Sequence, residues 1–247
     1  MDRTWRTRTS RIRLVLMAAT TATALSVTGC SVSLAEMIPT GSAGSLGSTG
    51  ATQQPGTNAA AALATLETIP VKGRAPKTGY SRDQFGQAWT DDVTVEFGHN
   101  GCDTRNDILA RDLTDIVYKQ GTKQCVVLSG TLADPYTGKT IKFVRGQDTS
   151  TAVQIDHVVA LSDAWQKGAQ QLSPEERRNL ANDPRNLIPV DGPTNGQKSD
   201  SDAASWLPPN KAYRCTYVSQ QITVKSIYHL WVTQAEKDAM QRILAAC

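Results

Sequence analysis

Residues 152–157 read Ala-Val-Gln-Ile-Asp-His, and residues 186–198 read Asn-Leu-Ile-Pro-Val-Asp-Gly-Pro-Thr-Asn-Gly-Gln-Lys. The first run alternates apolar and polar side chains, which predicts a strand that ends at Asp156 and His157. The second run predicts a short strand, a tight turn around Pro193 and a short helix. We expect these two runs to form the functional part of the chain.

The two runs together resemble a known nuclease motif. The residues that carry the resemblance are Asp156-His157, Asn186-Leu187, Asn195 and Lys198. They are similar to the His-Asn-His (HNH) endonuclease motif, in the variant whose last position is asparagine. The flanking residues 100–107 and 206–210 are similar to a family of secreted actinobacterial HNH-type proteins, and the resemblance covers roughly residues 71–247. It implies an α+β domain with a ββα-metal motif, in which a hairpin and a helix hold one divalent cation.

The resemblance implies roles for three residues of the motif. Cutting a phosphodiester needs an activated water, a cation near the phosphate and stabilisation of the departing oxygen. His157 would be the general base, because an imidazole with an ordinary pKa of about 6.5 is neutral often enough near pH 7 to accept a proton. Asp156 and Asn195 would be metal ligands, since their hard oxygen atoms suit Mg²⁺, with Mn²⁺ as the other candidate. The substrate would be nucleic acid, with DNA favoured over RNA.

Four more residues receive expected roles around this motif. Asn186 would brace the loop that positions His157, through its side-chain amide. Lys198, in the predicted short helix, could reach a phosphate oxygen. Arg105, in the similar flanking segment, and Arg145, at the end of a predicted strand, could approach the substrate phosphate.

Other classes of function are also considered. The main alternative is a noncatalytic envelope lipoprotein that uses the same fold to bind a wall or protein partner, without a divalent cation. A metallopeptidase is disfavoured because the sequence has no His-Glu-x-x-His pattern. His99 lies in a predicted turn and His229 near a predicted helix end. We expect both to be incidental, with His99 as an outside candidate for a second active-site imidazole.

The N-terminal segment predicts export. Five arginines precede an apolar stretch over residues 14–27, which is short for a membrane span and typical of a secretory signal. The stretch ends in Val-Thr-Gly-Cys, a pattern that matches the lipobox of bacterial lipoproteins, with Cys30 as the lipidated residue. An ordinary secretory signal is the alternative. We therefore predict a signal peptide over residues 1–29, a flexible tether over 30–70 and a nuclease-like domain over 71–247, either lipid-anchored at the extracellular face of the membrane or secreted.

The charge of the chain argues against DNA binding through bulk electrostatics. The full sequence has 26 basic and 23 acidic residues, for a net charge of +3. The first 29 residues hold five arginines and one aspartate, which leaves 21 basic against 22 acidic residues. Any affinity for nucleic acid must therefore come from a local patch and a bound cation. Residues 71–82 form a basic segment that is either such a contact or a solvated arm.

Four cysteines follow Cys30, and an even number in an exported chain indicates disulfides. They are Cys102, Cys125, Cys215 and Cys247. Three pairings are possible, and proximity in the sequence favours 102 with 125 and 215 with 247. A zinc site is disfavoured because no Cys-x-x-Cys spacing occurs.

The remaining pattern predicts a mixed α+β fold without an internal repeat. Helices are predicted over residues 58–66, 84–89, 105–116, 174–181 and 211–230, with a last helix opened by Thr233 and Glu236. Strands are predicted over residues 125–132 and 140–144, joined by a turn.

Overall fold

The structure, a computed structural model, describes residues 55–247. Every described residue belongs to one compact unit, residues 50–247. The predicted leader, the predicted lipidation site Cys30 and the first part of the predicted tether lie outside the described residues. Both disulfides and all three hydrophobic clusters lie within this unit, which therefore has its own core.

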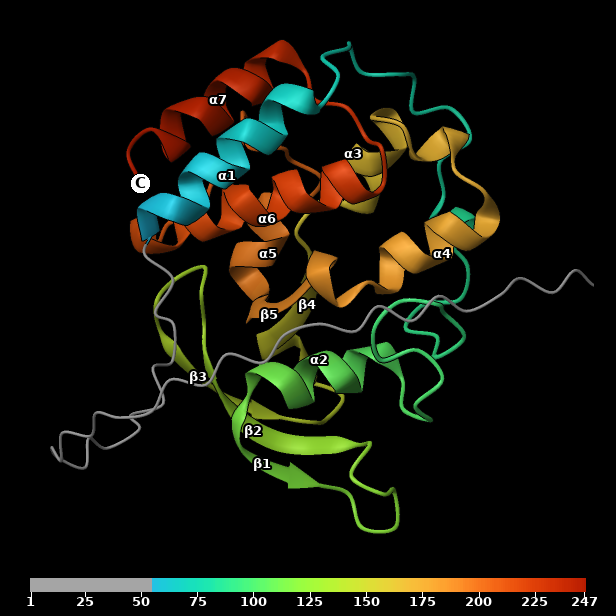
Figure 1. The fold of residues 1–247 in the computed structure, drawn as a ribbon. Coiled ribbons are helices and arrows are strands. Elements are labelled where there is room, and N and C mark those ends of the chain that lie inside the picture. The colour runs from blue at the N-terminus through green and yellow to red at the C-terminus, as the bar shows by residue number, and fades with distance from the viewer. Residues whose placement is uncertain (1–54) are drawn as a thin grey trace, which may run out of the picture. The chain divides into compact units, whose positions relative to one another are not determined.

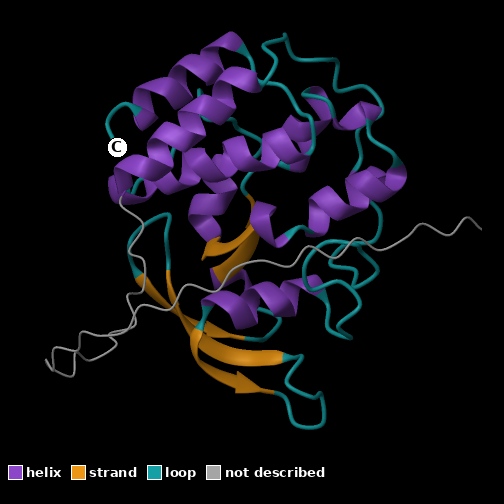
Figure 2. Ribbon diagram, viewed as in Figure 1, coloured by secondary structure: helices purple, strands orange, loops and turns teal. Residues whose placement is uncertain are grey.

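The unit has an α+β fold, as the sequence predicts. Its α-helices are α1 (Pro55–Thr68), α2 (Thr104–Asp112), α3 (Leu161–Gln166), α4 (Pro174–Asn182), α5 (Gly192–Lys198), α6 (Arg214–Ile227) and α7 (Gln234–Leu244). Its strands are β1 (Thr114–Tyr118), β2 (Val127–Ala133), β3 (Thr140–Val144), β4 (Val153–His157) and β5 (Leu187–Asp191). Figure 2 shows the strands gathered toward one end of the unit and most helices toward the other.

The strands form two separate antiparallel sheets. One has three strands in the order β1-β2-β3, and the other is the pair β4-β5. In Figure 1 the β4-β5 pair lies between the three-stranded sheet and the helices α1, α6 and α7. Helix α2 contacts both β2 and β5 and so connects the two sheets. The hairpin is therefore supported on both sides by packed elements.

Helix α1 belongs to the folded unit, because it packs on α6 and α7. Ala59, Ala62 and Leu66 are buried in the same hydrophobic cluster as residues of both helices. The last part of the predicted tether is therefore wrong: residues 55–68 form a helix whose apolar side chains are removed from water. Lys237 on α7 also lies 2.7 Å from the carboxylate of Glu67.

The helix predicted over residues 105–116 ends earlier than expected. The predicted apolar stripe is confirmed at Ile108 and Leu109, which are fully buried. At Leu113 the backbone becomes extended, and β1 pairs with β2 from Thr114 onward. The helical spacing of Ile116 was therefore misleading, because ladder hydrogen bonds and packing on the sheet override a local pattern. Strand β1 was not predicted.

Other elements differ from expectation mainly at their ends. The segment 84–89 holds only a 3-10 turn over residues 82–85, and the long helix predicted over 211–230 becomes a 3-10 turn followed by α6. The capping box at the start of α4 is confirmed in both directions. At the start of α7, Thr233 accepts the hydrogen bond from the backbone N–H of Glu236, but the Glu236 carboxylate points elsewhere.

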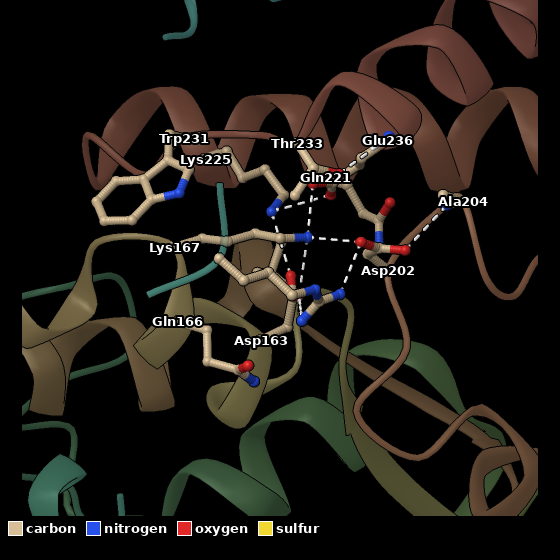
Figure 3. Close-up of polar contacts among 12 residues, drawn as sticks. Asp163, Gln166, Lys167, Asp202, Ala204, Gln221, Lys225, Trp231, Thr233 and Glu236 are labelled. Atoms are coloured by element: carbon tan, nitrogen blue, oxygen red, sulfur yellow. Dashed lines mark hydrogen bonds and ion pairs between the residues drawn. The ribbon is translucent and has the colours of Figure 1, made fainter. Parts of the chain in front are cut away.

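The Glu236 carboxylate joins a buried group of charges around Lys167. The Lys167 ammonium lies 2.6 Å from Glu236, 2.7 Å from Asp202 and 2.8 Å from Asp163. All four side chains are almost completely buried. Figure 3 shows Asp163 and Lys167, from α3 and its C-terminal cap, meeting Asp202 and Glu236 from other parts of the chain.

Two further cations complete this group, which we call the buried ion cluster. Lys225 Nζ lies 3.0 Å from Glu236 and 3.3 Å from Asp163, and Arg74 lies 3.0 Å from Asp163 and 2.7 Å from Asp202. Asp163 Oδ1 and Glu236 Oε1 lie close to their cations without the geometry of a hydrogen bond. Three cations thus face three carboxylates, so the buried charges are balanced.

The structure confirms both favoured disulfides, Cys102–Cys125 and Cys215–Cys247. The first fixes the segment before α2 to the start of β2, and the second fixes the end of the chain to α6. Within residues 55–247, no helix has the length and apolar character needed to cross a membrane.

Candidate active site

The β4-β5 hairpin places the predicted site residues at its open end. His157 pairs with Leu187, and Asp156 pairs with Ile188. Helix α5 follows β5 directly and contacts both strands. The arrangement is strand, strand and helix, as the resemblance implies. Because neighbouring residues of a strand face opposite sides, the side chains of Asp156 and His157 lie in different surroundings.

His157 is held by a backbone carbonyl. Its Nε2 lies 2.9 Å from the carbonyl oxygen of Ala181, at the end of α4. A carbonyl oxygen only accepts hydrogen bonds, so Nε2 carries the proton and Nδ1 keeps a free lone pair. Nδ1 makes no hydrogen bond to the described residues. Burial lowers the pKa of His157 to about 4, and the positive charges of Arg82 and Lys198 act in the same direction. The imidazole is therefore neutral near pH 7 and able to accept a proton.

Trp89 fixes the plane of the imidazole. The two rings stack with centroids 5.7 Å apart and planes 15° apart. The backbone of Trp89 has a φ of 58°, a left-handed conformation that a bulky side chain seldom adopts. Such strain costs on the order of 1–3 kcal/mol and persists where surrounding contacts impose it. Trp89 also packs against the hydrophobic cluster around α2, so it connects the candidate base to the core.

Asn186 bridges the loop that follows His157. Its side-chain oxygen accepts a hydrogen bond from the backbone N–H of Val159 at 2.8 Å, and its amide nitrogen donates to the carbonyls of Val159 and Leu180. Its own carbonyl accepts from the N–H of Val158. The side chain is fully buried. These contacts are those expected of a loop brace.

Asp156 lies in a buried polar contact with Lys198 and Tyr136. Lys198 Nζ lies 3.0 Å from Asp156 Oδ1 and also donates to the carbonyl of His157 at 2.9 Å. The Tyr136 hydroxyl donates to Asp156 Oδ2. Burial raises the pKa of the Asp156 carboxyl, and the nearby Lys198 opposes that shift. Burial and the Asp156 charge raise the pKa of Tyr136, so its hydroxyl keeps the proton that it donates.

Lys198 differs from its expected role. Its side chain is fully buried and faces the Asp156 carboxylate instead of the solvent, so it does not reach toward a phosphate. It connects helix α5 to the end of β4 and holds Asp156 in place. A lysine can make this contact at a small cost because the carboxylate and a backbone carbonyl satisfy its ammonium.

A cleft of about 520 Å³ opens at the end of the hairpin. It is lined by Lys77, Arg82, Asp156, His157, Asn195 and Asp200, among others. The amide nitrogen of Asn195 donates to Gln154 Oε1 at 2.9 Å, which leaves Asn195 Oδ1 without a partner among the described residues. The structure thus brings the predicted base and both predicted metal ligands to one cavity.

The donor set around the cleft fits a hard divalent cation that keeps most of its waters. Asp156 supplies a carboxylate whose oxygens retain lone pairs beside their two hydrogen bonds, and Asn195 Oδ1 is unengaged. Mg²⁺ is commonly bound by one or two protein oxygens together with water and substrate phosphate. No cluster of three or more His, Cys, Asp or Glu side chains suited to a metal occurs in the part of the chain that the structure describes.

The two predicted substrate-binding arginines lie away from the cleft. Arg105 donates to the backbone carbonyl of Val153, and Arg145 donates to the carbonyl of Val127 and to the side chain of Asn106. Neither lines the cleft. Burial and the neighbouring Arg145 lower the pKa of Arg105. Their contacts connect α2 and β3 to the strands beside them, and their role toward substrate stays a prediction.

Two other cations do line the cleft, both from the basic segment 71–82. Lys77 is paired with Asp200 at 3.0 Å. Arg82 has no ion-pair or hydrogen-bond partner for its side chain among residues 55–247. Most of this segment is exposed, but it is anchored to the fold, since Trp231 donates to the carbonyl of Gly73 and Arg74 enters the buried ion cluster.

Residues 103–243 match the family described as GmrSD restriction endonucleases, C-terminal domain. The chain belongs to this family. Membership in this GmrSD-type family supports an endonuclease that acts on nucleic acid. An uncharacterized secreted protein of Arthroderma benhamiae is 38% identical over 192 residues, which is 77% of this chain and 86% of that protein. No solved structure matches the chain.

Some residues of this candidate site could not be found from the sequence. Ala181 contributes a backbone carbonyl, which any residue has, and Tyr136 lies far from the motif in sequence. Arg82 was noticed only as one of several basic residues in a segment. The patterning of Trp89 gave no sign that it would stack on His157.

Proposed function

We propose that this protein is an exported HNH-type endonuclease that hydrolyses phosphodiester bonds, preferably of DNA, with a divalent cation, Mg²⁺ or Mn²⁺. The observation that carries the proposal is the orientation of His157. Its Nε2–H is fixed on the Ala181 carbonyl, which leaves Nδ1 unprotonated, and His157 lines the same cleft as Asp156 and Asn195. The secreted relative and the predicted leader support export, with lipidation at Cys30 as the proposed anchor.

His157 acts as the general base. A water in the cleft gives its proton to Nδ1, and the Ala181 carbonyl stabilises the imidazolium that forms, because it accepts a hydrogen bond from Nε2–H. The stacked Trp89 ring keeps the imidazole plane fixed during this transfer. The negative charge of an approaching phosphate favours the protonated form and so raises the pKa of the base in the complex.

The other residues hold the reacting groups in place. Asp156 and Asn195 would hold the cation, which supplies positive charge to neutralise the phosphate. Lys198 and Tyr136 orient the Asp156 carboxylate. Asn186 fixes the loop after His157 and so the direction of the imidazole.

A plasmid-nicking assay tests the proposal. The purified protein is incubated with supercoiled plasmid and Mg²⁺ or Mn²⁺, with a chelator as control. His157→Ala should lower the nicking rate by about 10²–10⁴-fold, the usual contribution of a general base. His99→Ala is the matched control, because His99 is exposed and lies 3.9 Å from Asp92. Equal rates for wild type and His157→Ala would remove His157 from the mechanism. A folded wild type that cuts no nucleic acid would refute the nuclease.

A further inference from the structure

His157 also lines a second and smaller cavity, of about 160 Å³. We call it the aromatic slot. Its walls include Phe85, Trp89, His157, Leu161, Ala181 and Asn182. This volume is well below the 300–1,000 Å³ or so of cavities that hold drug-sized ligands, so the slot suits a single flat ring system.

The lining of the slot is mixed. Its apolar and aromatic side chains are joined by the polar residues Arg82, Asp83, Gln87 and Asn182. Asn182 is almost completely buried at the end of α4, and its amide nitrogen donates to the carbonyl of Arg178 at 2.9 Å. Asn182 Oδ1 has almost no accessible surface, so it lies behind the wall of the slot and offers no contact to a ligand.

Arg82 connects the slot to the cleft, because it lines both cavities. It begins the 3-10 turn that also carries Phe85, one turn further along. Two contacts hold the turn in place. Phe85 packs against Trp165, and Arg177 donates to the carbonyl of Gln84 at 2.8 Å. The exposed Arg82 guanidinium thus projects from a rigid support without an acidic partner among residues 55–247.

We propose that the aromatic slot binds one nucleobase of the substrate and that Arg82 binds the phosphate attached to that nucleotide. This inference rests on the proposed nuclease function and adds a nucleotide subsite beside the base His157. Nucleobases stack on aromatic side chains, which matches Trp89 and Phe85 in the wall of the slot. A guanidinium binds phosphate oxygens with two parallel hydrogen bonds, which suits Arg82.

Binding of small ligands tests the subsite without any cleavage. The ligands are deoxyadenosine 5′-monophosphate and, as the base-free match, deoxyribose 5-phosphate, each titrated in the presence of a chelator and followed by NMR. The wild type should bind the nucleotide at least about tenfold more tightly than the base-free sugar phosphate, since base stacking alone contributes that much. Equal affinities would overturn the base slot.

Two variants test the phosphate contact and the base slot separately. Arg82→Ala should weaken both ligands at least about tenfold, the usual size of a lost charge-assisted contact. Ala88→Phe, which places a ring at the slot wall, should abolish the tenfold advantage of the nucleotide and leave the sugar phosphate unchanged. Arg242→Ala on α7 is the matched control for loss of an exposed arginine. An Arg82→Ala protein that binds like wild type would overturn the phosphate contact.

Ala88 is exposed, so the added ring of Ala88→Phe leaves the packed core intact. An advantage of the nucleotide retained in Ala88→Phe would overturn the slot. Failure of the subsite is distinct from failure of the nuclease: a protein that nicks plasmid but shows no base preference loses only the subsite. A protein that binds the nucleotide but cuts nothing loses only the nuclease.

Discussion

Lys167 in the buried ion cluster contacts three carboxylates, whereas Arg82 at the cleft contacts none among the described residues. Both regions are built from ordinary charged and polar side chains. In the cluster every charge faces an opposite charge, so the group joins α3, α6 and α7 to Asp202 and to the basic segment 71–82. In the cleft, His157 Nδ1 and Asn195 Oδ1 have no partner among the described residues. Paired buried charges mark structural support, and unpaired polar atoms at a cavity mark a place for a ligand.

The largest expected effect is the loss of Lys167. Lys167→Met leaves three buried carboxylates with two cations, which should lower the free energy of unfolding by about 3–5 kcal/mol. Lys237→Met is the control, because its ion pair with Glu67 lies at the surface and should change stability by less than about 1 kcal/mol. Urea unfolding measures both. Equal stabilities of Lys167→Met and wild type would show that the cluster does not support the fold.

The loop brace should come next in size. Asn186→Ala leaves the buried N–H of Val159 and two carbonyls without partners, which should cost about 2–3 kcal/mol of stability and also reduce nicking. Asn179→Ala, at a partly exposed contact with Thr94, should cost clearly less. Thermal unfolding and the plasmid assay report the two effects. A stable Asn186→Ala protein with full activity would contradict the assigned role.

Acid should weaken the buried ion cluster only at low pH, below the range in which His157 in the cleft gains its proton. Hydrogen bonds and charges of Lys167 and Arg74 outweigh burial and lower the pKa of Asp202 to about 2, from an ordinary value of 3.8. The ionised Asp202 carboxylate contributes about 1–2 kcal/mol to the free energy of unfolding, after allowance for screening. This contribution is complete above pH 4 and is lost as the pH falls toward 2. Asp202→Asn should lack this part of the acid dependence. Urea unfolding at several pH values between 2 and 5 measures it, and identical profiles would count against the pairing.

The smallest expected effect is stabilisation by a divalent cation. At a Mg²⁺ concentration of about three times its Kd, a cation that binds only the folded state adds about 0.8 kcal/mol. Differential scanning calorimetry with Mg²⁺ and with chelator measures the shift. Asn195→Ala should abolish it, whereas Asn100→Ala, far from the cleft in an exposed loop, should keep it. A shift of the same size in both variants would exclude Asn195 as a ligand, and no shift in the wild type would favour a noncatalytic binding protein.

Local patterns in the sequence determined a large part of this protein. The alternating run before Asp156 and His157, the turn around Pro193 and the cap at Ser173 each specify a short element through neighbouring residues, and the structure confirms these elements. The disulfide pairs followed from proximity, because each closes a loop of moderate length. The α+β class followed from the same local signals.

The tertiary structure alone decided which polar groups are occupied. Sequence cannot show that Lys198 and Lys167 are buried, because lysine is usually exposed and only distant partners such as Asp156 and Glu236 satisfy its charge. It cannot show that Ile116 leaves a helix for a strand, since the pairing partner lies on β2. The carbonyl that fixes the His157 tautomer comes from α4, and the tryptophan that stacks on the ring precedes α2. Local spacing determines elements, but the contacts that make a side chain reactive or inert come from segments distant in the sequence.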